Sequence, residues 1–167
     1  MRPSVELVPS YLDFLAEMTA RGERVWPAQP RAGETREDFV ARLLRAEVAP
    51  DPLDFPLPQT TYWGTVGQAV VGHIGLRHCL NAELAELGGH IGYTVRPSWR
   101  ARGLAKAMLR QVLQTPKARE IGRLLLTCAP DNLASNRTIQ ANGGTLERTI
   151  FVERVARMTN HYWIVLS

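Results

Sequence analysis

Arg100-Ala101-Arg102-Gly103-Leu104-Ala105 is the stretch from which the fold of this 167-residue chain can be read. The start of a helix exposes backbone N–H groups and the positive end of the helix dipole, and both attract phosphate. Gly103 has no Cβ that would hold a phosphate away from the backbone. Arg100 and Arg102 can add charge-assisted hydrogen bonds. The stretch therefore predicts a phosphate-binding turn, provided that a strand precedes it and a helix follows it.

The sequence on both sides of this turn has the required periodicity. Before it, Ile91, Tyr93 and Val95 alternate as in a strand, and Pro97 ends the pattern. After it, apolar residues recur at helical spacing until Pro116, and basic residues occupy the opposite stripe. The apolar positions are Leu104, Met108, Leu109, Val112 and Leu113, and the basic ones are Arg102, Lys106 and Arg110.

A second strand, turn and helix follow in the same order. Residues 123–128 form a short apolar run, which predicts a buried strand. Asn132 and Ser135 come directly after it, at the start of a helix that we expect to continue to Asn142. Gly143 and Gly144 then form a typical C-terminal stop signal.

These two blocks resemble the signature motifs of the GCN5-related N-acetyltransferase (GNAT) family. Arg100, Gly103 and Ala105 match the family pattern Gln/Arg-x-x-Gly-x-Gly/Ala, which seats the pyrophosphate of acetyl-coenzyme A. Asn132 and Ser135 match the family's Asn-x-x-Ala/Ser pattern, whose Asn contacts the cofactor arm. The resemblance implies acetyl-CoA as co-substrate and no metal. The cofactor-binding residues that it implies are Val95, which bonds through its backbone, and Arg100, Ala101, Arg102, Gly103, Leu104, Ala105, Lys106, Asn132, Ser135 and Asn136.

The resemblance also implies an α+β fold of the GNAT-like acyl-CoA N-acyltransferase type. In this fold a central mixed sheet, mostly antiparallel with one parallel pair at its centre, carries helices on both faces. The predicted element order is β-α-α-β-β-β-α-β-α-β-β, and Thr35 with Asp38 predicts the cap of the second helix. Strands are expected at residues 5–8, 59–66, 69–77, 89–97, 123–128, 145–152 and 158–166. We expect a single N-acetyltransferase domain over residues 1–167.

Composition excludes several classes of protein. An apolar fraction of 45% and a charged fraction of 22% are typical of soluble globular chains. No run of about 18 apolar residues predicts a membrane span, and residues 1–6 lack the apolar core of a signal peptide, so we expect a cytoplasmic protein. Cys79 and Cys128 are expected to be buried free thiols, and no group of residues has metal-ligand spacing.

The acid–base residues are less clear than the cofactor motifs. In the family, a Glu on the strand before the phosphate turn often serves as base, whereas this strand offers His90 and Tyr93. His90 has an unperturbed pKa near 6.5, which suits a base at neutral pH, and the alternative is a histidine hydrogen-bonded within the sheet. The family's usual acid, a Tyr seven residues after the motif Asn, is replaced by Ile139. Tyr162 on the last strand is the substitute we expect, with a packed aromatic as the alternative.

The leading function is an N-acetyltransferase that transfers an acetyl group from acetyl-CoA to a primary amine, directly and in a ternary complex. The alternative is a non-catalytic acyl-CoA-binding regulatory module, which the absent Tyr favours. A net charge of +4 suggests a nucleic-acid partner, but the basic residues are scattered and the anionic cofactor accounts for them. We expect a small-molecule or peptide amine as acceptor, no membrane partner, and one or two copies of the chain. Residues 26–33 and 49–58 are expected to shape the acceptor pocket.

Overall fold

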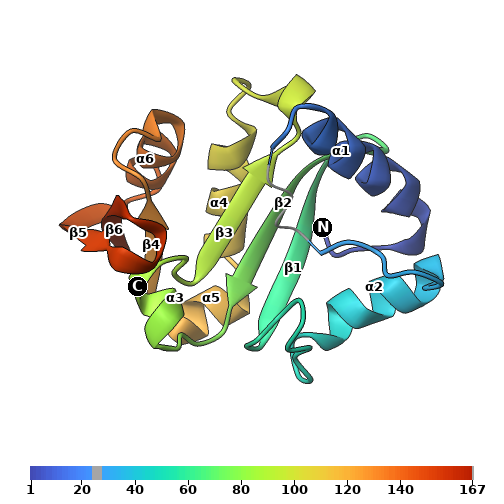
Figure 1. The fold of residues 1–167 in the computed structure, drawn as a ribbon, viewed down its shortest axis with the longest axis horizontal. Helices are drawn as coiled ribbons and strands as arrows, with labels where there is room; N and C mark the ends of the chain where they lie inside the picture. The colour runs from blue at the N-terminus through green and yellow to red at the C-terminus, as the bar shows by residue number, and fades with distance from the viewer. Residues whose placement is uncertain (24–27, 167) are drawn as a thin grey trace. The chain divides into compact units, whose positions relative to one another are not determined.

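The computed structural model describes residues 1–23 and 28–166. These residues form two compact units, which alternate along the chain (Figure 1). The first unit is Met1–Gly75 with Tyr93–Leu104, and the second is Leu76–Gly92 with Ala105–Ser167. Trp26 and Pro27, which the sequence placed in the loop over residues 26–33, lie outside the described residues.

The first unit packs two helices against a β-hairpin. In Figure 1, α1 (Val8–Ala20) and α2 (Arg36–Arg45) lie beside β1 (Gln59–Val66), which turns into β2 (Ala69–Arg77). β3 (Ile91–Val95) completes a sheet of order β1-β2-β3. The core of the unit is aromatic, and the Tyr11 ring of α1 stacks on the Trp63 ring of β1 with 4.3 Å between centroids. β1 and β2 have the bounds predicted from the sequence.

The strand expected at residues 5–8 is wrong. Val5–Leu7 forms a 3₁₀-helix and α1 begins at Val8, with Pro9 in its first turn, where proline is tolerated. The helical spacing of the buried residues extends back into the segment that looked like a strand, so burial on α1 decided its conformation. The apolar positions that α1 buries are Val8, Tyr11, Phe14, Leu15 and Met18.

Two polar contacts fix α2 in the first unit. The predicted cap is confirmed, because the Thr35 hydroxyl accepts a hydrogen bond from the Asp38 N–H at 3.1 Å. Arg42 is buried and binds Glu34 with both Nε–H and a terminal N–H, each at 2.7 Å. This hydrogen bond lowers the pKa of Glu34 to about 2. Arg42 also binds Asp54, so the buried guanidinium joins α2 to the segments before and after it.

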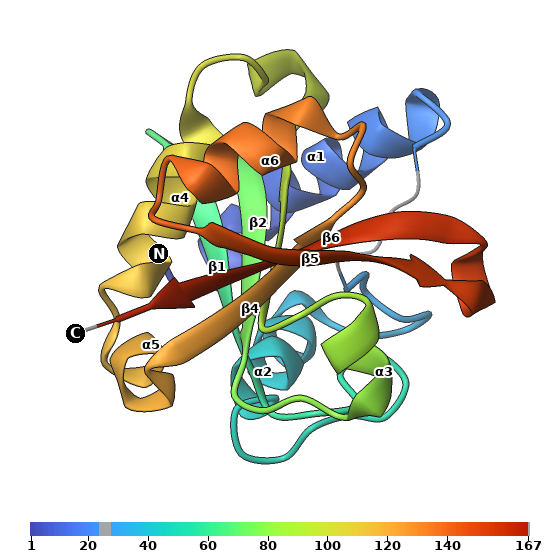
Figure 2. The ribbon, with the colours of Figure 1, turned by 90° about the vertical axis from the view of Figure 1, so that its left-hand side faces the viewer.

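The second unit is built on three antiparallel strands with β6 in the middle. β6 (Arg157–Val165) pairs with β4 (Arg123–Cys128) on one side and with β5 (Thr145–Val152) on the other. α6 (Leu133–Gln140) runs along this sheet (Figure 2). α4 (Leu104–Leu113) gives the unit most of its length before Pro116 begins α5 (Pro116–Ile121). The bounds of β4 and β5 are those predicted from the sequence.

Several details of the second unit differ from the sequence prediction. α6 ends at Gln140 rather than Asn142, and Gly143 then adopts a φ of 85°. α3 (Ala82–Glu86) was not predicted, and it is capped by the Asn81 side chain, which accepts from the Leu84 N–H. α5 was not predicted either, because Pro116 was read only as the end of the preceding helix. Both helices are too short to give a periodic signal.

The described strands form two three-stranded sheets rather than the single sheet expected. Within the second unit, Gly89 forms one isolated bridge with Leu126. The chain approaches β4 so closely there that a Cβ on Gly89 would lie 2.3 Å from the Leu125 carbonyl oxygen. Glycine is therefore required at this crossing, and its φ of +63° adds to that requirement.

Both cysteines are free thiols, but only one is buried as expected. Cys128 ends β4 and is buried, whereas Cys79 is exposed. The expectation was wrong for Cys79 because β2 ends at Arg77, so that Cys79 lies beyond the strand. The described helices include none with the length and hydropathy of a membrane span.

Candidate functional site

The turn between β3 and α4 has a backbone suited to an anion. It lies in the first unit, and two of its residues have left-handed backbone conformations, Ala101 with φ 59° and Gly103 with φ 74°. Alternation of such conformations turns successive N–H groups toward one side, which forms an anion-binding concavity. A Cβ on Gly103 would meet no atom within 4 Å, so the space beside this backbone is open. α4 begins directly after it at Leu104 and adds its own N–H groups.

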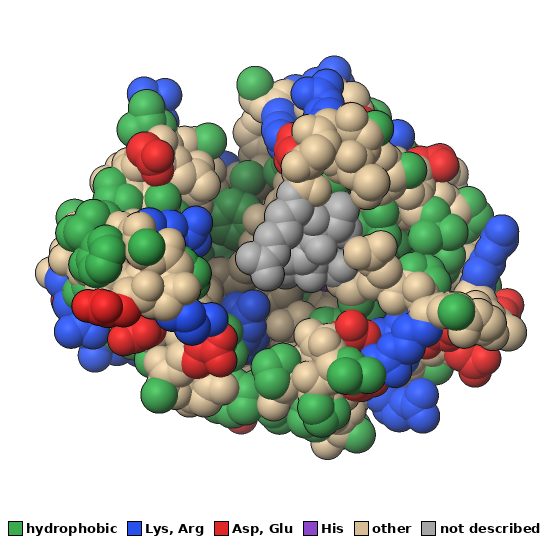
Figure 3. Space-filling view, viewed as in Figure 1, with side chains coloured by type: hydrophobic (Ala, Val, Ile, Leu, Met, Phe, Trp, Pro, Cys, Tyr) green, Lys and Arg blue, Asp and Glu red, His purple; other side chains and the backbone are tan. Residues whose placement is uncertain are grey.

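The two arginines of the turn already have partners in the protein. The Arg100 Nε–H donates to the Val95 carbonyl at 3.0 Å, and its two terminal nitrogens bind the Glu23 carboxylate at 2.8 and 2.5 Å. The Arg102 guanidinium lies over the Trp99 ring, 4.9 Å from its centroid. Basic side chains gather over this turn at the top of Figure 3. The sequence predicted these arginines as phosphate ligands, and the structure shows them engaged elsewhere.

Glu17 of α1 fixes the start of the same turn. Its carboxylate accepts from Arg96 Nε at 2.6 Å, from the Ser98 N–H at 2.5 Å and from the Ser98 hydroxyl at 2.9 Å. Burial alone would raise the pKa of Glu17, but these hydrogen bonds outweigh it and lower the pKa. Glu17 and Glu23 were missed by the sequence analysis. They lie far from the motif in sequence, and only the position of Glu23 after the helix stop at Gly22 could have drawn attention to it.

In the second unit, Asn132 is the N-cap of α6. Its Oδ1 accepts a hydrogen bond from the Ser135 N–H at 3.1 Å. The side chain is exposed, and its Nδ2 takes no part in this cap. The predicted motif therefore lies at a helix start, with one half of the Asn132 amide used for structure.

Asn136 is buried at the centre of a polar network. Its Nδ2 donates to the carbonyls of Ala129, Pro130 and Asn132 at 3.0, 3.3 and 2.8 Å. Its Oδ1 accepts from the Tyr162 hydroxyl at 2.5 Å and from Asn160 Nδ2 at 2.9 Å. The side chain that the sequence assigned to the cofactor thus joins the turn after β4 to β6.

Tyr162, the expected thiolate acid, belongs to this network. Its side chain is 2% exposed and its hydroxyl proton is given to Asn136. Burial and the neighbouring Cys128 raise the pKa of Tyr162. Ser135 is a partly exposed hydroxyl in the first turn of α6, and its side chain hydrogen-bonds Cys128. Ile139 is 1% exposed and packs under Gly144, so the position at which the family has its usual Tyr belongs to the core of this unit.

His90, the expected base, is held between two strands of the second unit. Its N–H donates to the Leu125 carbonyl at 2.7 Å, and its ring Nδ1 accepts from the Leu125 N–H at 2.9 Å. An accepting Nδ1 places the ring proton of neutral histidine on Nε2. Burial, and to a lesser extent the charge of Arg77, lowers the pKa of His90 to about 4. This arrangement is the hydrogen-bonded alternative, and it does not favour proton uptake near neutral pH.

The remaining predicted residues are partly exposed or exposed. Tyr93 and Val95 lie in β3 with partial exposure, and the Val95 carbonyl is the acceptor for Arg100. Leu104 and Ala105 are partly exposed in the first turn of α4. The Lys106 side chain is exposed, and its carbonyl accepts from Asn142 Nδ2 at 3.3 Å within the second unit.

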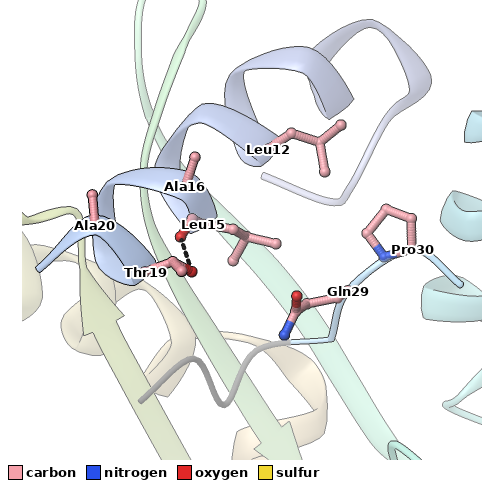
Figure 4. Close-up of a pocket in the computed structure, with 7 residues that line it drawn as sticks. All are labelled: Leu12, Leu15, Ala16, Thr19, Ala20, Gln29 and Pro30. Carbon is pink, nitrogen blue, oxygen red and sulfur yellow. Dashed lines mark hydrogen bonds between the residues drawn. The ribbon is translucent and has the colours of Figure 1, made fainter. Parts of the chain in front are cut away.

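The first unit also contains a cavity of about 590 Å³ beside α1 (Figure 4). Gln29 and Pro30 line it, and both belong to the segment expected to shape the acceptor pocket. The Thr19 hydroxyl donates to the Leu15 carbonyl at 3.1 Å, so the helix side of the cavity presents mainly apolar atoms. The residues that line it are Leu12, Leu15, Ala16, Thr19, Ala20, Gln29 and Pro30, and the segment 49–58 contributes none of them.

Residues 5–145 match the family model of the acetyltransferase (GNAT) domain. The chain belongs to the GNAT acetyltransferase family. The match includes both turns, so the family inferred from the sequence is confirmed, and with it the assignment as an acyltransferase. None of the curated proteins matches the sequence.

Solved structures of other GNAT acetyltransferases have a similar fold. The microcin C7 self-immunity acetyltransferase MccE, solved with acetyl-CoA and AMP, has a TM-score of 0.67 and 15% identity, covering 99% of this chain and 91% of MccE. The ribosomal L7/L12 α-N-protein acetyltransferase RimL, solved with coenzyme A, has a TM-score of 0.67 and 17% identity over 99% and 92% of the two chains. An aminoglycoside acetyltransferase solved with coenzyme A and kanamycin has a TM-score of 0.63 and 13% identity over 99% and 92%. The expected fold class is confirmed.

Proposed function

We propose that this GNAT acetyltransferase transfers the acetyl group of acetyl-CoA to a primary amine by direct attack in a ternary complex. The observation that carries the proposal is the turn before α4, where two left-handed residues, an open backbone and a helix start coincide. Similar structures were solved with acetyl-CoA or coenzyme A, which supports the same cofactor here.

Backbone groups are the main cofactor ligands in this proposal. The N–H groups of residues 101–105 would bind the pyrophosphate, because the arginine side chains beside them are engaged with other groups. The Val95 N–H would bond the pantetheine arm, as the family resemblance implies. Asn132 would donate to the arm from Nδ2, since its Oδ1 caps α6. Asn136 would support the turn from inside, because it is buried.

Gly103→Val tests the cofactor site. The new side chain projects into open space, so the unit should fold, with some backbone strain at a φ of +74°. It should also exclude the pyrophosphate and weaken acetyl-CoA binding by about 10²-fold or more in calorimetry, the equivalent of about 3 kcal/mol. Gly143→Val, at another exposed left-handed glycine, is the matched control for strain. Unchanged affinity in a folded Gly103→Val protein would refute the assignment.

For the chemistry, the geometry favours positioning over a histidine base. The acceptor amine would lose its proton to water, held by Tyr93 or by the backbone of β3, because His90 presents a ring N–H. Ser135 is a better placed acid for the thiolate than Tyr162, since its hydroxyl is partly exposed and lies against a sulfur atom. The main catalytic contribution would then be orientation of amine and thioester.

The kinetics of three variants separate these roles. His90→Asn keeps an acceptor near the Nδ1 position, and it should retain kcat/KM near neutral pH. Tyr162→Phe should lower stability more than the rate, whereas Ser135→Ala should lower kcat by about 10-fold or more without a matching rise in the acetyl-CoA Kd. A loss of about 10²–10⁴-fold in His90→Asn, together with the acidic limb of the pH profile, would restore His90 as the base.

A non-catalytic acyl-CoA-binding module is the second candidate, and the buried Ile139 at the family's Tyr position favours it. Release of free thiol from acetyl-CoA with a panel of amines distinguishes the two functions. The panel should include a peptide α-amine, an aminoglycoside and an aminoacyl nucleotide, which differ in size and charge. The cavity beside α1 favours acceptors with an apolar group. The cytoplasmic location and the single-domain organisation expected from the sequence stay predictions.

A further inference from the structure

The C-terminus of α1 aims a carboxylate at the turn before α4. Gly22 has a φ of 67°, and its N–H donates to the Thr19 carbonyl, while the Glu23 N–H donates to the Met18 carbonyl. This pair of bonds is a Schellman motif, which fixes the direction of the chain as it leaves the helix. Glu23 is therefore positioned by the backbone, and its carboxylate reaches Arg100 across 77 residues of sequence.

Glu23 occupies the part of Arg100 that would bind a phosphate. Its two oxygens accept from the two terminal nitrogens of the guanidinium, at 2.8 and 2.5 Å. A guanidinium binds phosphate through the same paired N–H groups as it binds carboxylate. The third nitrogen, Nε, already donates to the Val95 carbonyl. Arg100 therefore cannot hold a phosphate with two bonds while it holds Glu23.

We propose that Glu23 is an internal counter-ion of the cofactor site, which occupies Arg100 in the free protein and which a cofactor phosphate displaces. This inference rests on the proposed function, because it takes the turn before α4 as the phosphate site. Glu23 then sets the affinity for the cofactor by competition, and Arg100 exchanges one anion for another.

The turn does not need Glu23 for its conformation. Glu17 holds Arg96 and Ser98 through three hydrogen bonds, and the Nε–H of Arg100 ties the turn to β3. The Arg100–Glu23 pair is also exposed, with 42% and 31% of the two side chains accessible. Exposed ion pairs stabilise proteins little, so an anion held by several N–H groups can replace the carboxylate. Loss of the Glu23 charge should thus release Arg100 and leave the turn intact.

Glu23→Gln tests the competition. The variant keeps the shape of the side chain and the backbone bond to Met18, and it should bind acetyl-CoA about 2–5-fold more tightly than wild type in calorimetry, the range of an exposed pair. Glu37→Gln in α2 changes the net charge equally, and Glu37 lies in a different element. We expect the affinity of that control to equal that of wild type.

The double variant tests whether the gain passes through Arg100. In an Arg100→Gln background, Glu23→Gln should leave the affinity unchanged, because no guanidinium is present to be released. The inference is overturned if Glu23→Gln binds no more tightly than wild type, if Glu37→Gln shows the same gain, or if the gain persists without Arg100. Failure of the proposed site looks different, because Gly103→Val would then bind acetyl-CoA as wild type does.

Discussion

Two turns of this protein follow a strand and begin a helix, and they use their polar side chains in opposite ways. In the turn before α4, Arg100 and Arg102 form exposed contacts at the surface and leave the backbone N–H groups beside open space. In the turn before α6, Asn136 is buried and its amide is saturated by five hydrogen bonds within the protein. The first turn is built to exchange partners and the second to keep them. The following predictions test that difference.

The largest difference should appear in stability. Asn136→Ala removes a buried amide and strands the Tyr162 hydroxyl and Asn160 amide, which should lower the free energy of unfolding by about 2–4 kcal/mol. Arg100→Gln removes only exposed contacts, so its effect should stay below about 1 kcal/mol. Urea unfolding of both variants measures the two effects. Equal losses would mean that the two turns do not differ in this way.

The two units should also respond to acid in different pH ranges. The pKa of His90 is about 4 in the folded protein and near 6.5 when unfolded, so the unfolded state binds more protons between these values. The second unit should therefore lose about 1–3 kcal/mol as the pH falls from 6.5 to 4. The pKa of Glu34 is about 2, below its usual value, so its contribution to the first unit persists above pH 4.5 and is lost toward pH 2.

Hydrogen exchange at pH 7, 5.5 and 4 measures these losses segment by segment. Protection of β4 should decrease before that of α2, and His90→Asn should flatten the pH dependence of β4. Burial also lowers the pKa of His161, which adds a loss of the same sign in the second unit. Earlier loss of protection in α2 would contradict the assignment of acid sensitivity to the second unit.

Asn132 should show a smaller effect that divides into two parts. Asn132→Ala removes the cap of α6 and should cost about 1 kcal/mol of stability in urea unfolding. It should also weaken acetyl-CoA binding by about 1–2 kcal/mol, the loss of one or two hydrogen bonds. Asn132→Ser keeps a capping oxygen but lacks the amide donor, so it should recover the stability and not the affinity. Recovery of both would leave Asn132 with a structural role alone.

The smallest effect is expected at Glu17. Glu17→Gln removes the charge that binds Arg96 and Ser98 on a partly exposed surface, so stability should fall by less than about 1 kcal/mol. Thermal unfolding measures the change, and Asp13→Asn on the same helix is the control for charge. A loss of several kcal/mol would show that the first turn depends on fixed contacts as much as the second.

The sequence predicted the backbone of both turns well, because strand alternation, helical spacing and glycine or asparagine at a helix start are local patterns. β1, β2, β4 and β5 have the predicted bounds for this reason. The 3₁₀-helix at Val5–Leu7 was mistaken for a strand, since a short apolar segment fits either period. The helix α3 has five residues, too few for a helical repeat.

The roles of the side chains could not be predicted in the same way. Asn136 and Tyr162 are 26 residues apart and Arg100 and Glu23 are 77 apart, so nothing in the local sequence indicates either contact. His90 illustrates the same limit, because its ring is held by the Leu125 N–H of another strand. A motif indicates where a polar group stands in the chain, whereas the partner that occupies it depends on the tertiary fold.

Ala101 has a consequence of a different kind. It adopts a φ of 59° without being glycine, a conformation that costs an ordinary residue about 1–2 kcal/mol. The folded protein bears this strain whether or not a ligand is present, and the turn is therefore preorganised: it is shaped once, during folding, and need not be shaped again at each encounter with a ligand. Ala101→Gly would relieve the strain but give the unfolded chain, and a loosened turn, more conformations to choose from. Stability and association rate would then respond in different directions to the removal of a single methyl group.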